Sequence, residues 1–142
     1  MSAPTAGDVP VRRPDLSVIV VTWNVAELAT VTVRRALERC GALAVEVLVV
    51  DDASADGTAD RLRHDFRDEP RVQVLDAGAN LGFPRANNLA LGRARGRHVL
   101  FLNPDTEVGK GTLEACVAEL DADPALGVVG CRLEYADGRI QY

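Results

Sequence analysis

Acidic and amide side chains follow two apolar runs of the sequence, where each run turns polar. Asp51 and Asp52 come directly after Val45–Val50, and the turn Asn103-Pro104-Asp105 comes directly after His98–Leu102. Carboxylate and amide oxygens accept hydrogen bonds from a nucleobase or ribose, and they are also ligands for hard cations. These positions are therefore the first candidates for a binding site.

Proline stands between the two polar residues of the second turn. Pro104 fixes its own φ and pushes Asn103 toward extended geometry, so the strand ends at a defined place and Asp105 lies just outside it. An Asn-Pro-Asp sequence is also a common solvated turn. The turn alone leaves both interpretations open.

A glycine-containing loop precedes a second candidate. Asn80-Leu81-Gly82-Phe83 leads into a helix whose first turn holds Pro84 and Arg85. Gly82 lets the backbone approach a ligand, and backbone N–H groups with a guanidinium suit a diphosphate. An ordinary capped helix with a solvated Arg85 is the alternative.

Short β-branched apolar runs alternate with segments of helical periodicity. The runs start near residues 16, 45, 71 and 98, at the spacing of βαβ units, which predicts an α/β fold with a mostly parallel sheet and helices on both faces. We expect helices over 26–40, 58–66, 84–94 and 111–120.

Parallel strands place the loops after their carboxyl ends at one edge of the sheet. The residues after the first run, Thr22 and Asn24, should therefore lie near Asp51, Asp52, the loop 76–83 and the turn 103–105. Helix capping explains polar residues at such positions as well. Convergence of four loops favours a ligand site.

Several classes of function are disfavoured. The formal net charge of −5 argues against a surface that coats nucleic acid. The chain lacks the glycine-rich motifs of P-loop nucleotide hydrolases and dinucleotide dehydrogenases, and its two histidines form no Ser-His-Asp pattern. The basic run Arg93, Arg95, Arg97 and His98 is interpreted as solvated surface.

Cysteine usage and the ends of the chain give further expectations. Cys40, Cys116 and Cys131 are interpreted as small core or helix residues of a reducing compartment. We expect residues 1–14 to be a flexible leader and 15–142 to be one domain. The expected location is the cytoplasm, and association with the inner face of a membrane is left open.

The C-terminal residues suggest the start of a hairpin. Val128–Tyr135 alternates as a strand does, Asp137-Gly138 is a turn signal, and Ile140–Tyr142 begins a return strand. The domain is therefore expected to be incomplete at its C-terminus.

Taken together, these motifs resemble the family 2 glycosyltransferases of the GT-A fold, particularly their rhamnosyltransferase-like branch. The resemblance covers about Leu16–Tyr135, and its phrases occur in the family's order. They are Ser17–Asn24, Val49–Thr58, Asn80–Phe83 with Ala86–Asn88, and Leu102–Thr106.

The resemblance implies roles for individual residues. Thr22 and Asn24 would line the nucleoside pocket, and Asp51 would contact the base or ribose, whereas Asp52 is a candidate from its position at the strand end. The stretch from Asn80 to Arg85, which includes Gly82, would border the nucleotide-sugar site. Asp105 would bind the metal, Mg²⁺ or Mn²⁺, with Asn103 where the first acid of the family's metal motif usually stands. A single carboxylate leaves diphosphate oxygens and water to complete the coordination.

The implied reaction is metal-assisted, inverting transfer from a nucleoside diphosphate sugar, of uridine or thymidine type, to a hydroxyl of a saccharide or lipid-linked acceptor in cell-wall or polysaccharide biosynthesis. Its catalytic base is expected beyond Tyr142, because the nearest acids, Glu134 and Asp137, match no family acid. No catalytic residue is assigned, and the sequence does not specify an oligomeric state.

Two alternatives have different chemistry. A receiver-type phosphoacceptor signalling domain is also compatible with the sequence, because it would use the strand-end acids of Val-Leu-Val-Val-Asp-Asp and a second strand-end acid, Asp105. A non-catalytic nucleotide-sugar-binding module would fit a chain that lacks the base.

Overall fold

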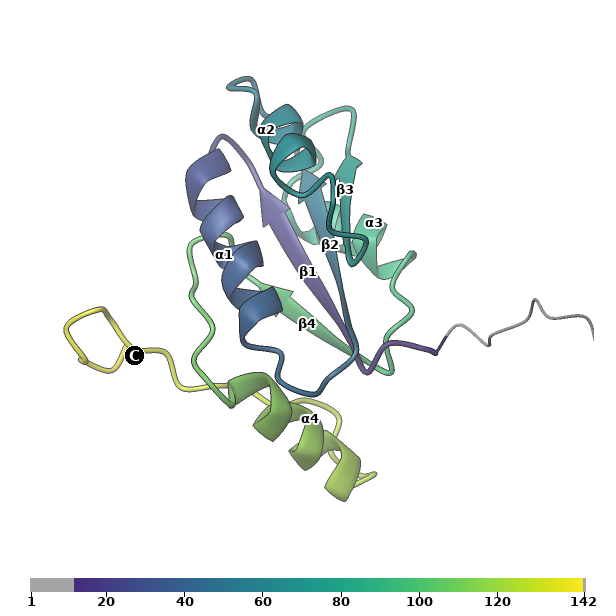
Figure 1. Cartoon of the computed structure of the whole chain (residues 1–142), viewed down its shortest axis with the longest axis vertical. Helices are drawn as coiled ribbons and strands as arrows, with labels where there is room; N and C mark the ends of the chain where they lie inside the picture. The colour runs from purple at the N-terminus through teal and green to yellow at the C-terminus, as the bar shows by residue number, and fades with distance from the viewer. Residues whose placement is uncertain (1–11, 142) are drawn as a thin grey trace, which may run out of the picture.

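Four strands and four helices alternate along the described residues, 12–141, of a computed structural model (Figure 1). Each predicted element before residue 123 is present, and most of its bounds differ from the prediction by a few residues at most. The elements are β1 (Leu16–Thr22), α1 (Ala26–Glu38), β2 (Val45–Asp51), α2 (Thr58–Asp65), β3 (Val72–Asp76), α3 (Phe83–Leu91), β4 (His98–Leu102) and α4 (Thr112–Ala122).

The strands form one parallel sheet in the order β3-β2-β1-β4. In this register Thr22 of β1 is the partner of Asp51 of β2, which is the partner of Asp76 of β3. The carboxyl ends of these three strands therefore lie side by side, as the sequence predicts.

The two central strands are buried on both faces. Every residue of β1 and β2 is buried, which explains their nearly continuous apolar sequences. Val18 and Val20 pack with α1, α2 and α4 on one face, whereas Ile19 and Val21 pack with α3 on the other. The predicted α/β class with helices on both faces is confirmed.

A buried carboxylate joins the amino-terminal ends of the strands. Glu46, 5% exposed, accepts hydrogen bonds from Ser17 Oγ (2.7 Å), Arg95 N (2.6 Å) and the Arg95 guanidinium (2.9 and 2.7 Å). Burial alone would raise the pKa of Glu46, but these hydrogen bonds outweigh it and leave the pKa below its usual value. Ser17 Oγ also accepts a hydrogen bond from Gly96 N at 2.8 Å.

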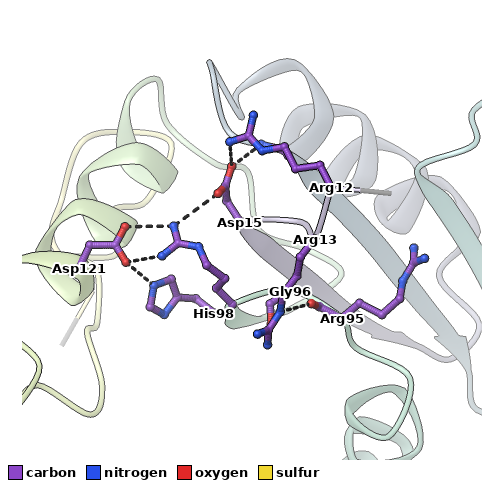
Figure 2. Close-up of polar contacts among 9 residues, drawn as sticks. Arg12, Arg13, Asp15, Arg95, Gly96, His98 and Asp121 are labelled. Atoms are coloured by element: carbon purple, nitrogen blue, oxygen red, sulfur yellow. Dashed lines mark hydrogen bonds and ion pairs between the residues drawn. The ribbon is translucent and has the colours of Figure 1, made fainter. Parts of the chain in front are cut away.

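A second cluster of charged side chains attaches α4 to the amino-terminal edge of the sheet (Figure 2). Arg97 donates to both carboxylate oxygens of Asp121, at 2.8 and 3.1 Å, and to Asp15, while His98 Nε2 lies 2.8 Å from Asp121 Oδ1. Arg95 and Arg97 are exposed, as the solvated interpretation of the basic run predicts, whereas His98 is partly buried, and all three side chains also contact a carboxylate. Packing brings carboxylates from β2 and α4 within reach of them.

Asp121 stays ionised over a wide pH range. Hydrogen bonds from Arg97, and then from His98, lower its pKa from 3.8 to about 2. Because the folded pKa is depressed, the stabilisation by this carboxylate is complete above pH 3.8 and is lost as the pH falls through about 2. The attachment of α4 should therefore persist under mildly acidic conditions.

The chain after α4 differs from the sequence-based prediction. The predicted strand Val128–Tyr135 is wrong: only an isolated antiparallel bridge, Glu134 to Ile140, forms there. The turn is present, because Gly138 N donates to Tyr135 O. No neighbouring strand pairs with residues 128–133 among those described, so their alternating pattern has nothing to pack against. Tyr142, the end of the predicted return strand, lies outside the described residues.

The leader prediction falls mostly outside the described part of the chain, which starts at residue 12. Arg13 donates through its guanidinium to the carbonyl oxygens of Arg95 (2.8 Å) and Gly96 (3.2 Å) (Figure 2). In addition, Pro14 O accepts a hydrogen bond from Arg97 N. These contacts attach residues 13 and 14 to the sheet. The helices described here are all too short or too polar to cross a bilayer.

Replacing Gly96 should destabilise the fold. A Cβ at this position would overlap Ser17 N and lie 2.7 Å from Ser17 Oγ, so Gly96→Ala forces β1 and the 95–97 turn apart. We expect a loss of about 1–3 kcal/mol in the free energy of unfolding, measured by urea denaturation.

The matched control is Gly92→Ala, whose Cβ meets only carbonyl oxygens at 3.7 Å. Equal stability of the two variants would contradict this interpretation of the 95–97 turn.

Candidate functional site

A cleft of about 470 Å³ opens at the carboxyl ends of the strands. It lies where the strand order changes direction, between β1 and β4, which is the usual ligand position in open α/β sheets. Six of the predicted site residues line it: Thr22, Asp52, Asn80, Gly82, Asn103 and Asp105. The predicted convergence of the strand-end loops is thus present in the structure.

Asn24 lies next to the cleft and connects two of its loops. Its backbone has a φ of +53°, a conformation that Asn tolerates better than most residues. Asn24 N donates to Ser54 Oγ and Asn24 Oδ1 accepts from Ala55 N, both at 2.8 Å. The side chain therefore fixes the loop after β1 against the loop after β2. A direct ligand contact stays a prediction.

Asp51 is buried, 2% exposed, and is not among the residues that line the cleft. One oxygen accepts from Ser54 N at 3.0 Å, while Oδ1 has no partner among the described residues. Thr22 Oγ1, on the neighbouring strand, is likewise buried and without a partner there. Two polar atoms at this end of the sheet thus retain unused hydrogen-bonding capacity, although such atoms usually find partners.

Asp52 positions the glycine-containing loop. Its Oδ1 accepts from Leu81 N at 2.7 Å and its Oδ2 accepts from Gly82 N at 3.0 Å. Gly82 has a φ of +76°, which favours glycine. The carboxylate therefore holds the start of α3 against the cleft.

Arg85 does not line the cleft. It is exposed in the first turn of α3, beyond Gly82 and Phe83. Contact of Arg85 with a diphosphate stays a prediction.

The turn after β4 is attached to α1. Thr32 Oγ1 donates to Pro104 O at 2.8 Å, and Thr106 N donates to Asn103 O at 3.2 Å. This leaves the Asn103 and Asp105 side chains exposed at the cleft. Their amide and carboxylate oxygens suit Mg²⁺ or Mn²⁺. No group of three or more His, Cys, Asp or Glu side chains that could hold a metal occurs among the described residues, so ligand oxygens would have to complete such a site.

Apolar side chains at the cleft were not predicted. Trp23, Leu28 and Phe83 line it and are 57%, 51% and 53% exposed. Aromatic faces stack on nucleobases and contact sugar rings. Trp23 directly follows β1 at the edge where the loops converge, and this position in the sequence could have identified it as a site residue.

The strand order contradicts the receiver-type alternative. Receiver domains have the order 2-1-3-4-5, whereas β1 here lies between β2 and β4. Crossovers in the two folds place strand-end acids differently, so the shared Asp-Asp sequence does not imply a shared site.

Residues 17–142 match the profile of Glycosyl transferase family 2. Among curated relatives, the N-acetylglucosaminyl-diphospho-decaprenol L-rhamnosyltransferase of Mycobacterium tuberculosis is 31% identical in an alignment of 107 residues that covers 68% of this chain and 34% of that enzyme. The predicted similarity to the rhamnosyltransferase-like branch is confirmed.

Two solved structures have the same fold. The mannosyltransferase PcManGT from Pyrobaculum calidifontis, in complex with GDP-Man and Mn²⁺, aligns with a TM-score of 0.75 and 32% identity over 89% of this chain and 37% of that chain. TarS 1-349 of S. aureus, in complex with UDP-GlcNAc, aligns with a TM-score of 0.65 and 31% identity over 76% and 31%. The GT-A fold is confirmed, and this chain spans about a third of each of these proteins.

Replacing Asp52 should loosen the loop that borders the cleft. Asp52→Asn leaves one oxygen for two N–H donors, so one buried donor loses its partner. We expect about 1–3 kcal/mol of destabilisation and faster amide exchange at Leu81 and Gly82, measured by hydrogen exchange.

Asp105→Asn is the control, since Asp105 lies at the same cleft but is exposed and accepts no hydrogen bond within residues 12–141. Unchanged exchange at both amides in Asp52→Asn would show that the carboxylate does not hold the loop.

Proposed function

Since this chain belongs to glycosyl transferase family 2, we propose that its cleft binds a nucleoside diphosphate sugar for transfer of the sugar to an acceptor hydroxyl. The observation that carries the proposal is the meeting of Thr22, Trp23 and Asp105 in one cleft at the carboxyl ends of β1 and β4. PcManGT with GDP-Man and TarS with UDP-GlcNAc, both similar in fold, support a ligand of this class.

The nucleoside is proposed to bind beside β1. The Trp23 indole is exposed for stacking, and the Thr22 hydroxyl, which is buried and has no partner among the described residues, is proposed to turn toward a base carbonyl when the nucleoside binds. Uracil and thymine present two carbonyl oxygens and one N–H. A uridine or thymidine diphosphate sugar is therefore the proposed ligand, with Asn24 and Asp51 holding the backbone N–H groups of Ala55 and Ser54.

The diphosphate is proposed to bind beside the 103–105 turn. Asp105 and Asn103 would hold Mg²⁺ or Mn²⁺ together with diphosphate oxygens, and PcManGT with Mn²⁺ supports divalent metal use. A bound cation there supplies neutralisation of the negative charge on the departing nucleoside diphosphate. Gly82 lines the same cleft at the start of α3, and Arg85, in the first turn of α3, is proposed to reach the diphosphate from outside the cleft lining.

Transfer requires an acceptor hydroxyl to reach the anomeric carbon and lose its proton. We propose inversion at that carbon, as the family resemblance implies, with a saccharide or lipid-linked acceptor. Glu134 and Asp137 form ion pairs with Arg132 and Arg139 and lie outside the cleft lining. Neither is assigned as the base, and the described residues are proposed to bind the donor.

A nucleotide-sugar-binding module without catalysis is the second candidate. It is favoured by one observation: within the described residues, the cleft contains Asp52, whose oxygens are already occupied, and Asp105, which is proposed to bind the metal. Binding without release of free sugar or product would support this candidate, whereas multiple turnovers by residues 1–142 would contradict it.

Replacing Asp105 should remove metal-dependent donor binding. The carboxylate is the one charged ligand proposed for the cation, and loss of a charged partner costs roughly 1.5–3 kcal/mol, so Asp105→Asn should weaken binding of a uridine diphosphate sugar by about tenfold or more in the presence of Mn²⁺. Isothermal titration calorimetry measures this.

The control is Glu107→Gln, an exposed acid two residues away that pairs with Arg35 and does not line the cleft. Unchanged affinity in Asp105→Asn would remove the metal assignment.

Nucleoside binding should quench the fluorescence of Trp23, the one tryptophan in the sequence. Base stacking contributes about 1–3 kcal/mol, so Trp23→Ala should weaken nucleotide binding about tenfold, measured by calorimetry with UDP, dTDP and GDP.

Tyr135→Ala, which removes an exposed aromatic residue that does not line the cleft, should bind as the parent does. Stronger binding of GDP than of UDP or dTDP would contradict the uridine or thymidine preference.

A further inference from the structure

Two of the three cysteines are in contact in the structure although they are separated in the sequence. Cys116 Sγ on α4 is 3.2 Å from Cys131 Sγ, and both are free thiols. The third, Cys40, is buried at the end of α1, where its thiol donates to Leu37 O. Cys131 is exposed, so the expectation that all three are core or helix residues is wrong for Cys131.

The two thiols belong to segments of different structure. Cys116 belongs to a helix that is fixed to the sheet by Leu113 and Val117 in the core and by the contacts of Asp121 with Arg97 and His98. Cys131 belongs to residues 123–133, which form neither helix nor strand. A segment without regular structure can adjust its backbone to the distances that a disulfide requires.

We propose that Cys116 and Cys131 form a reversible disulfide that fastens residues 123–133 to α4. The proposal is independent of the cleft and of its ligand. Three features of the structure support it: the thiols are already in contact, one of them is open to solvent, and no cation site competes for them among the described residues.

The oxidant is a low-molecular-weight disulfide such as oxidised glutathione. The exposed Cys131 thiolate attacks one sulfur of the reagent, the reagent S–S bond breaks, and one reagent thiol leaves. Cys116 then loses its proton and attacks Cys131 Sγ in the mixed disulfide, releasing the second reagent thiol. Overall, two protein thiols lose two electrons and two protons, which the two released reagent thiols carry away.

Cys116 is suited to the second step. Burial, and then the hydrogen bond with Cys131, raise its pKa to about 11, so it reacts slowly with reagents in solution. Its position beside Cys131 gives it an effective concentration on the order of millimolar or higher toward the mixed disulfide. The order of attack therefore follows from exposure and contact.

Incubation of residues 1–142 in a series of oxidised and reduced glutathione ratios tests the proposal. Alkylation and mass spectrometry should show two of three thiols lost. Trypsin leaves both cysteines on residues 111–132, so cleavage after Glu114 and Glu119 should give two cysteine-containing fragments, 115–119 and 120–132, that stay joined until reduction. Oxidation should also slow tryptic cleavage after Arg132.

Variants separate this pair from other thiol reactions. Cys40→Ser should form the same cross-link, whereas Cys131→Ser, at an exposed position that leaves the core unchanged, should form none. Three free thiols at every ratio, a persistent glutathione adduct on Cys131, or a cross-link that includes Cys40 would each overturn the proposal.

Discussion

The parallel register of β1 with β2 and β4 is the constraint on which the cleft depends. β1 and β2 are buried on both faces, and a shift by one residue would exchange the side chains that face α1 with those that face α3. In the observed register Thr22 stands beside Asp51, and Val20 stands beside Leu102, one residue before Asn103. Packing of the apolar runs therefore sets the positions of the polar residues that follow them.

Charges at the opposite edge reinforce that register. Glu46 is buried, so its carboxylate must remain paired, and its partners, Ser17 and Arg95, come from β1 and from the turn before β4. Gly96 has no room for a side chain beside Ser17. The strand starts are thus held at one edge by polar contacts, and the strand ends are aligned at the other, where the cleft opens.

The sequence predicted the sheet well because buried parallel strands are apolar throughout, and the bounds of β1 follow directly from Leu16–Thr22. It failed where a pattern needs a partner from elsewhere in the chain. Val128–Tyr135 alternates like a strand but has no neighbouring strand among the described residues, and the ion pairs of the exposed Arg95 and Arg97 were not predicted because Glu46 and Asp121 are distant in sequence. The residues that line the cleft could be predicted because they follow strand ends. The hydrogen bonds by which Asp52 holds the loop could not, because that loop lies 29 residues away in the sequence.

The cleft divides its polar groups into two kinds. Asp52 and Asn24 use their oxygens to hold loops, so their hydrogen bonds exist before any ligand arrives. Asp105 and Asn103 are exposed, and one carboxylate with one amide makes a weak cation site. In the proposed complex the diphosphate supplies the missing oxygens, so cation and donor each complete the other's site. Thermodynamic linkage then requires that the cation strengthen donor binding by the same factor by which the donor strengthens cation binding. This arrangement would keep the cleft from holding metal tightly when no donor is present.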